Sequence, residues 1–238
     1  MGYTGRTVFE TQLHTFRQQR RHRHSLTHGA ALPALASNRL LSFAASSIVG
    51  VFLPIFLYEF FDLSIAAVLL WYAINFAVKF PFQVWAAQIF SRTGLIASMV
   101  LGTLGIMLFY WTFYLLDTGS RLNPFLLMAV GIFGLMIVSC FYWSPFHIDY
   151  ASLSPKRSRG AYLARLYALQ QLITVITPVI AGWVILTYGY HVNFFLGLVL
   201  AGASIVPLLF LPSFKVNYEF GFWESFRRLF SRRFRPMS

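Results

Sequence analysis

Residues 166–214 read "LYALQQLITVITPVIAGWVILTYGYHVNFFLGLVLAGASIVPLLFLPSF" and contain no Asp, Glu, Lys or Arg. A helix that crosses a bilayer needs about 20 mostly apolar residues, so this stretch is too long for a single span. The letters "TYGYH" stand in its middle, where Gly189 and His191 indicate a turn. The stretch therefore predicts two membrane-spanning helices joined by a tight connection.

Apolar runs between clustered charges also fill the chain upstream. No charge occurs between Arg39 and Glu59, and the runs that end at Asp117 and Asp149 are long enough to span. The run after residue 63 has the length of a span as well, although Lys79 lies near its centre. We therefore predict an all-α, polytopic membrane protein, a six-helix bundle with spans at residues 38–59, 64–90, 94–116, 123–150, 162–187 and 192–212.

The cations are distributed unequally over the two predicted sides of the membrane. Of the 19 Lys and Arg residues, six lie in the stretch that ends at Arg39 and six follow residue 213. The connection between the fourth and fifth spans, with the start of the fifth, carries four more, whereas the opposite side carries only Arg121. Positive residues favour the cytoplasmic side, so both termini are expected in the cytoplasm and the chain in the plasma (inner) membrane.

Three segments follow from this topology. Residues 1–36 are predicted to form a basic cytoplasmic tail without the apolar core of a signal peptide, and residues 37–212 the bundle. In the tail at residues 213–238, Phe222, Phe226 and Phe230 stand at helical spacing with arginines mostly opposite. This tail is expected to lie on the anionic inner leaflet of the lipid bilayer or to bind a partner. Topology thus explains the basic composition, and no nucleic acid partner is expected.

Three local motifs carry a resemblance to a known family. The connection after the second span reads "AQIFSRTGLI" and resembles the loop G-x-L-a-D-R-x-G-R-R through Ile89, Arg92 and Gly94, with Ser91 in place of Asp. The fifth span contains "TPVIAGW", which resembles G-P-x-x-G-G, and "SPKRSRGAY" before it resembles P-x-x-x-R-G. With the predicted topology, these motifs resemble the amino-terminal six-helix half of a major facilitator superfamily (MFS) transporter.

The resemblance implies a function and a set of gating residues. Such a half would move a small solute by alternating access, as a secondary transporter, together with a second six-helix bundle that is either another copy or a split partner. The motifs, with Asp149 as a candidate ion-pair partner of Arg92, Arg159 or Arg165, place gating at Arg92, Gly94, Asp149, Arg159, Gly160, Pro178 and Gly182. Pro145 and Pro178 either permit bending or only shape static packing.

Lys79 is the most informative single residue. A cation at mid-membrane costs roughly 2.5–3.5 kcal/mol on insertion scales, so it is expected to face a polar interior. Trp71 and Asn75 precede it at helical spacing and share its face. No mid-membrane carboxylate is an obvious partner, so an anionic solute is predicted there. The alternative is a lysine that reaches the interface or pairs with a buried group.

Further polar residues admit both a structural and a functional role. His147 could couple to protons or simply be hydrogen-bonded in the bundle. Gln170, Gln171 and Thr174 form a polar face of the fifth span, as Ser42 and Ser46 do in the first, and either face could join helices or meet solute. The predicted substrate cavity comprises Trp71, Asn75, Lys79, Trp143, His147 and Gln171.

Two competing functions were weighed against transport. An enzyme is not expected, because the chain lacks a G-x-S-x-G turn, an H-E-x-x-H pair and any second cluster of metal ligands. No cofactor and no metal site are predicted, and the single Cys140 lies within a span. A membrane scaffold or assembly factor derived from a transporter half remains the alternative, since the loop that contains Ser91 departs from the family pattern.

Overall fold

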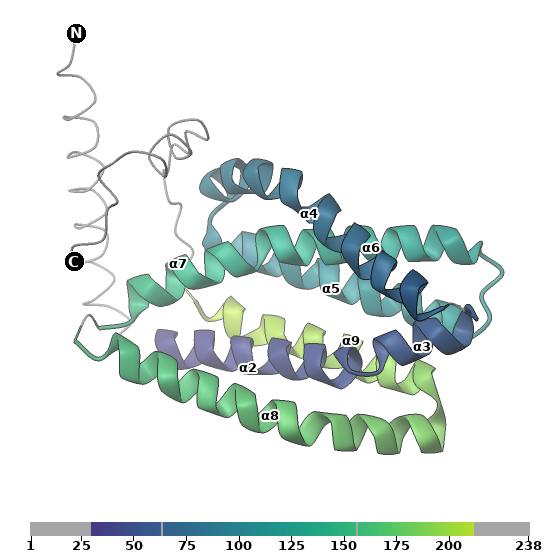
Figure 1. Cartoon of the computed structure of the whole chain (residues 1–238). Helices are drawn as coiled ribbons and strands as arrows, with labels where there is room; N and C mark the ends of the chain where they lie inside the picture. Colours follow the sequence, from purple (N-terminus) through teal and green to yellow (C-terminus); the bar gives the residue numbers. More distant parts are fainter. Residues whose placement is uncertain (1–29, 63, 156, 212–238) are drawn as a thin grey trace, which may run out of the picture.

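The computed structural model describes residues 30–62, 64–155 and 157–211, whose regular secondary structure is entirely helical (Figure 1). Both predicted tails lie almost wholly outside these residues. Gly189, with a φ of 89°, forms the predicted turn between the last two helices. The described helices are α2 (Ala31–Gly50), α3 (Leu53–Phe60), α4 (Ile65–Thr93), α5 (Leu95–Asp117), α6 (Pro124–Phe141), α7 (Trp143–Leu153), α8 (Arg159–Tyr188) and α9 (Tyr190–Leu209).

Helix α5 is the centre of the bundle. It packs mainly against α6 and α9, while α2 packs against α9 and α8 and α4 lies on α6. Figure 1 shows these helices side by side along one axis, with α4 crossing α5 and α6 at an angle. One buried cluster surrounds Phe56, Phe113 and Phe194, and a second surrounds Met99 and Tyr142.

Two long helical segments are each broken once. Pro54 stands in the first turn of α3, where its missing N–H costs little, and the break lies just before it. Pro145 stands in the first turn of α7, so it cannot donate to the carbonyl of Phe141, the last residue of α6. By contrast, Pro178 lies inside α8 without ending it. Bending of the helices at Pro145 or Pro178 during function stays a prediction.

Glycines bring α5 and α6 unusually close together. A Cβ added at Gly134 would lie 2.5 Å from the carbonyl oxygen of Gly105, and one added at Gly105 would lie 2.8 Å from that of Gly134. In lipid, helix association depends on such close packing because there is little water to exclude. The two glycines therefore hold the central helix pair at backbone contact.

The predicted fold class is confirmed. Among the described residues, five helical segments are long and apolar enough to cross a membrane: Ala31–Phe60, Leu95–Asp117, Pro124–Leu153, Arg159–Tyr188 and Tyr190–Leu209. In α4 only Ile65–Lys79 forms an apolar stretch, so a sixth span stays a prediction. The first segment begins at Ala31 rather than at the predicted residue 38, because Pro33 is tolerated in a first helical turn. Arg39 consequently lies well inside it.

Candidate functional site

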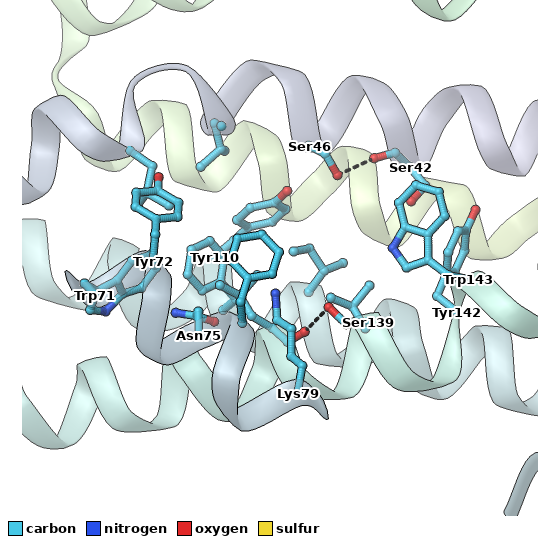
Figure 2. A pocket seen from close by; sticks show the side chains of 18 of the residues that line it. Ser42, Ser46, Trp71, Tyr72, Asn75, Lys79, Tyr110, Ser139, Tyr142 and Trp143 are labelled. Atoms are coloured by element: carbon cyan, nitrogen blue, oxygen red, sulfur yellow. Dashed lines mark hydrogen bonds between the residues drawn. The ribbon is translucent and has the colours of Figure 1, made fainter. Parts of the chain in front are cut away.

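A cavity of about 290 Å³ opens between the helices from α2 to α7. Its volume lies at the small end of the range for small-molecule pockets. Figure 2 shows Ser42 and Ser46 on the α2 side and Asn75 and Lys79 on the α4 side, with Tyr110 between them. The described lining is Arg39, Ser42, Ser46, Val49, Gly50, Leu53, Trp71, Tyr72, Asn75, Phe76, Lys79, Ile106, Phe109, Tyr110, Leu135, Val138, Ser139, Tyr142 and Trp143.

Lys79 supplies an ammonium to this cavity from α4. Its side chain is half-buried and extends into the space in Figure 2, and its Nζ lies 4.9 Å from the centroid of the Phe76 ring. Within the part of the chain that the structure describes, no carboxylate forms an ion pair with it. The ammonium is therefore available to a negatively charged group that enters the cavity.

Asn75 and Trp71 precede Lys79 by one and two turns on the lining face of α4. Asn75 is only 2% exposed, yet neither its Nδ2 nor its Oδ1 has a hydrogen-bond partner among the described residues. The indole Nε1 of Trp71 is likewise buried without a partner there. Buried polar groups are nearly always hydrogen-bonded, so these two nitrogens and one oxygen on the lining face of α4 are unusual in having no protein partner among the described residues.

Arg39 supplies a second cation from α2. The residue is 5% exposed, and its guanidinium carbon lies 4.2 Å from the ring centroid of Trp143 and 5.6 Å from that of Phe146. Sequence reasoning assigned Arg39 to the end of the tail and missed it. Helical spacing was the available signal, since Arg39, Ser42 and Ser46 recur at intervals of three and four residues.

Hydrogen bonds between helices hold the wall that carries Tyr142 and Tyr110. The Tyr142 hydroxyl donates to Oδ1 of Asn38 at 2.8 Å, and Nδ2 of Asn38 donates to the Ser204 carbonyl at 2.6 Å. The Tyr110 hydroxyl donates to the Ala45 carbonyl at 3.0 Å. These bonds join α5, α9 and the junction between α6 and α7 to α2, and they fix the lining in place.

Of the predicted cavity residues, the structure brings Trp71, Asn75, Lys79 and Trp143 together on one lining. His147 stacks on Trp143 at 6.2 Å between ring centroids but is exposed and not part of the described lining. Gln171 is exposed on α8, away from this lining. A substrate role for any of these residues stays a prediction.

Three of the seven predicted gating residues lie where α7 meets α8. Arg159 donates from Nε to Oγ of Ser154 at 2.9 Å and from a terminal nitrogen to the Ala151 carbonyl at 2.6 Å. Asp149 is fully buried, and its Oδ1 accepts a bond from Oγ of Ser152 at 3.3 Å. Gly160 follows Arg159 at the exposed start of α8.

The other gating candidates lie elsewhere in the bundle. Gly94 forms the buried turn between α4 and α5 with a φ of 97°, a conformation that favours glycine. Pro178 and Gly182 lie within α8, where a Cβ on Gly182 would lie 3.3 Å from Cζ of Phe52. Arg92 lies in α4, with its side chain outside the described part. The gating roles stay predictions.

This arrangement defines an integral, multi-pass membrane protein with a largely apolar cavity between its helices, into which a few polar and charged groups are placed, as in small-molecule binding sites. The family model described as Major Facilitator Superfamily matches residues 35–236, so the chain belongs to that superfamily. The resemblance inferred from the sequence is thereby confirmed. Comparison with curated proteins gives no match. Members of the superfamily are typically transporters of small solutes rather than enzymes, which assigns the chain a general role in membrane transport.

Proposed function

We propose that the chain binds a small anionic solute in the cavity that the helices from α2 to α7 line, and that it carries the solute across the membrane by alternating access. One observation supports this proposal above the others: the described lining contains two cations, Arg39 and Lys79, and no acid. Positive charge in a low-dielectric site is costly unless a partner compensates it, and a bound anion supplies that partner. Asn75, one turn from Lys79 on the lining face, adds unpartnered hydrogen-bond groups beside the solute.

Uptake into proteoliposomes tests the role of Lys79. The reconstituted chain would be offered radiolabelled acetate, lactate, succinate and glutarate. We expect Lys79→Ala to lower anion uptake by at least about tenfold, since a charge-assisted bond is lost. Lys79→Arg should retain part of the uptake, because the charge survives while its geometry changes. Arg121→Gln, which removes an exposed cation outside the cavity, is the matched control.

The alternative function is decided by the same measurement. Normal uptake by Lys79→Ala would contradict the proposed site. Absence of uptake of every anion by the unaltered chain, both alone and with a second bundle, would favour a non-transporting scaffold. Both variants are expected to fold, since Lys79 has no ion-pair partner among the described residues that its loss would leave uncompensated.

A second bundle is part of the proposal, and α8 is the helix that would meet it. Only 22% of the apolar, membrane-spanning stretch of α8 is buried within the bundle. The exposed residues of α8 include the polar Gln171 and Thr174. Polar groups within a span usually face protein rather than lipid. In a Cys140→Ser background, Thr174→Cys should therefore form a disulfide-linked dimer in membranes if the partner is a second copy. Val199→Cys, exposed on α9, is the control, and monomers in both cases would exclude a homodimer through this face.

The proposed orientation places both termini in the cytoplasm. Residue 158 should then be shielded, and residue 120 accessible, to a membrane-impermeant thiol reagent added to intact cells. The test uses Ser158→Cys and Ser120→Cys in the Cys140→Ser background. The reverse labelling pattern would overturn the orientation and leave the cavity proposal untouched.

A further inference from the structure

Arg39 is a buried cation without an acidic partner in the described chain. Among the described residues, no carboxylate lies within ion-pair distance of Arg39, and Asp117 contacts the ring of His191 instead. The guanidinium is met by the ring faces of Trp143, Phe43 and Phe146, at 4.2, 5.4 and 5.6 Å from their centroids, and by the neutral hydroxyl of Tyr142. Cation–π contacts stabilise a charge by less than its full burial costs. Arg39 is therefore incompletely compensated within its own bundle.

The second cation lines the same cavity from a different helix. Arg39 comes from α2 and Lys79 from α4, and each has a neutral polar residue of the lining near it on its own helix. Ser42 follows Arg39 by three residues, and Asn75 precedes Lys79 by four. Figure 2 shows Ser42 and Asn75 on different sides of the space. The cavity thus has two polar, positively charged parts rather than one.

The lining between these two parts offers no further charge. It consists of the rings of Phe109 and Tyr110 and of aliphatic and hydroxyl groups, and the hydroxyls of Tyr110 and Ser139 donate to backbone carbonyls. Two like charges beside one small cavity repel each other, and an anion near only one of them leaves the other uncompensated. A solute with a negative group at each end and an apolar middle compensates both.

We infer that the solute carries two separate anionic groups, as a small dicarboxylate does, and that Arg39 binds one of them while Lys79 binds the other. This inference rests on the proposed function and specifies its substrate class. Arg39 thereby determines specificity: it distinguishes a dianion from the monoanion of the same length. Asn75, one turn from Lys79 on the lining face of α4 and with unpartnered polar atoms, assists in binding the anionic group held by Lys79.

Equilibrium binding to the purified full chain in lipid nanodiscs tests the inference separately from transport. Trp71 and Trp143 line the cavity, so tryptophan fluorescence reports occupancy. The probes are succinate, glutarate and adipate, each paired with its monomethyl ester, which keeps the length and loses one charge. Phenyl phosphate is added as a dianion whose two charges share one group.

In the unaltered chain we expect at least one diacid to bind about tenfold or more tightly than its half-ester, the loss expected for one charge-assisted hydrogen bond. Arg39→Gln should lower diacid affinity by about the same factor and change half-ester affinity little, so the ratio approaches one. Arg39→Lys should restore part of the preference, and Arg121→Gln should leave it unchanged. The ratio separates specificity from damage to the fold, because a misfolded site loses both ligands together.

Several outcomes would overturn the inference. These are equal affinity for diacid and half-ester in the unaltered chain, equal loss of both in an Arg39→Gln chain that folds as the unaltered chain does, a preference for phenyl phosphate over every diacid, and no binding of any probe. Half-ester binding that depends on Lys79 alone would leave anion transport standing and remove Arg39 from it. Diacid binding without uptake into liposomes would remove the proposed transport and leave the two-anion site standing.

Discussion

The seam between α2 and α9 and the inner face of α4 both bury asparagine, and they use it differently. Asn38 and Asn193 are 0% and 1% exposed, and each donates from Nδ2 to a carbonyl of the facing helix, at 2.6 Å to Ser204 and 3.1 Å to Ile48. Asn75 is 2% exposed and contacts no hydrogen-bond partner among the described residues. A buried amide in this bundle therefore has one of two roles: it hydrogen-bonds a neighbouring helix, or it is left available to a ligand. The presence or absence of a hydrogen-bond partner distinguishes these roles.

This comparison has a direct energetic consequence. Removing a bonded amide strands the partner that it satisfied, whereas removing an unpartnered amide relieves a buried polar group of its desolvation cost. Leucine is an apolar residue of similar size, so the same Asn→Leu change can be made at all three positions. The seam positions should then lose stability, and the α4 position should lose ligand binding.

Asn38→Leu is expected to have the largest effect on the free energy of unfolding. The change removes the acceptor to which the buried Tyr142 hydroxyl donates, and it also removes the bond to the Ser204 carbonyl. A buried group left without its partner costs about 1–3 kcal/mol, so we expect a loss of about 2 kcal/mol. Titration of the purified chain with sodium dodecyl sulfate would measure it. Ser37→Leu, at the exposed neighbouring position, should change the free energy by less than about 0.5 kcal/mol.

Asn75→Leu should show the converse behaviour. Its unfolding free energy should stay within about 0.5 kcal/mol of the original or rise, because no partner is stranded. Anion affinity, measured by tryptophan fluorescence in nanodiscs, should fall about tenfold, the value of the one or two hydrogen bonds that the amide offers a solute. A loss of stability as large as that of Asn38→Leu, with unchanged affinity, would place Asn75 with the helix-joining asparagines and break the comparison.

The sequence predicted the membrane fold because hydropathy depends on local composition. A long charge-free run such as residues 166–214 is stable in the hydrocarbon core of the bilayer, and Gly189 divides that run into two helices as expected. Lys79, Asn75 and Trp71 were found for a similar reason. A cation within a span needs an explanation from its own helix, and a spacing of four residues places its neighbours on one face.

Residues whose role depends on other helices could not be predicted in the same way. Arg39 stands near the predicted start of a span, where a cation reads as a topology signal, and its burial follows from rings on α7 that the local sequence does not bring to it. Gln171 belongs to a polar face of α8, yet the described cavity is lined from α2 to α7. The difference between Asn38 and Asn75 is likewise tertiary, since only the facing helix supplies or withholds a partner.

Asn193→Leu is expected to cause a smaller loss of stability than Asn38→Leu and, unlike Asn75→Leu, no loss of anion affinity. It therefore has the smallest measurable effect of the three. Its Nδ2 bonds the Ile48 carbonyl at 3.1 Å, but its Oδ1 is buried without a partner among the described residues. Loss of one interhelical bond in a membrane protein costs about 0.6 kcal/mol on average, and removal of the unpartnered oxygen offsets part of it. We therefore expect a loss below about 0.6 kcal/mol in the detergent titration, with anion affinity unchanged. The double variant with Asn38→Leu should show additive losses, because the two asparagines share no partner. A loss at Asn193 equal to that at Asn38 would mean that burial in the seam, rather than the number of bonds satisfied, sets the contribution of a membrane asparagine.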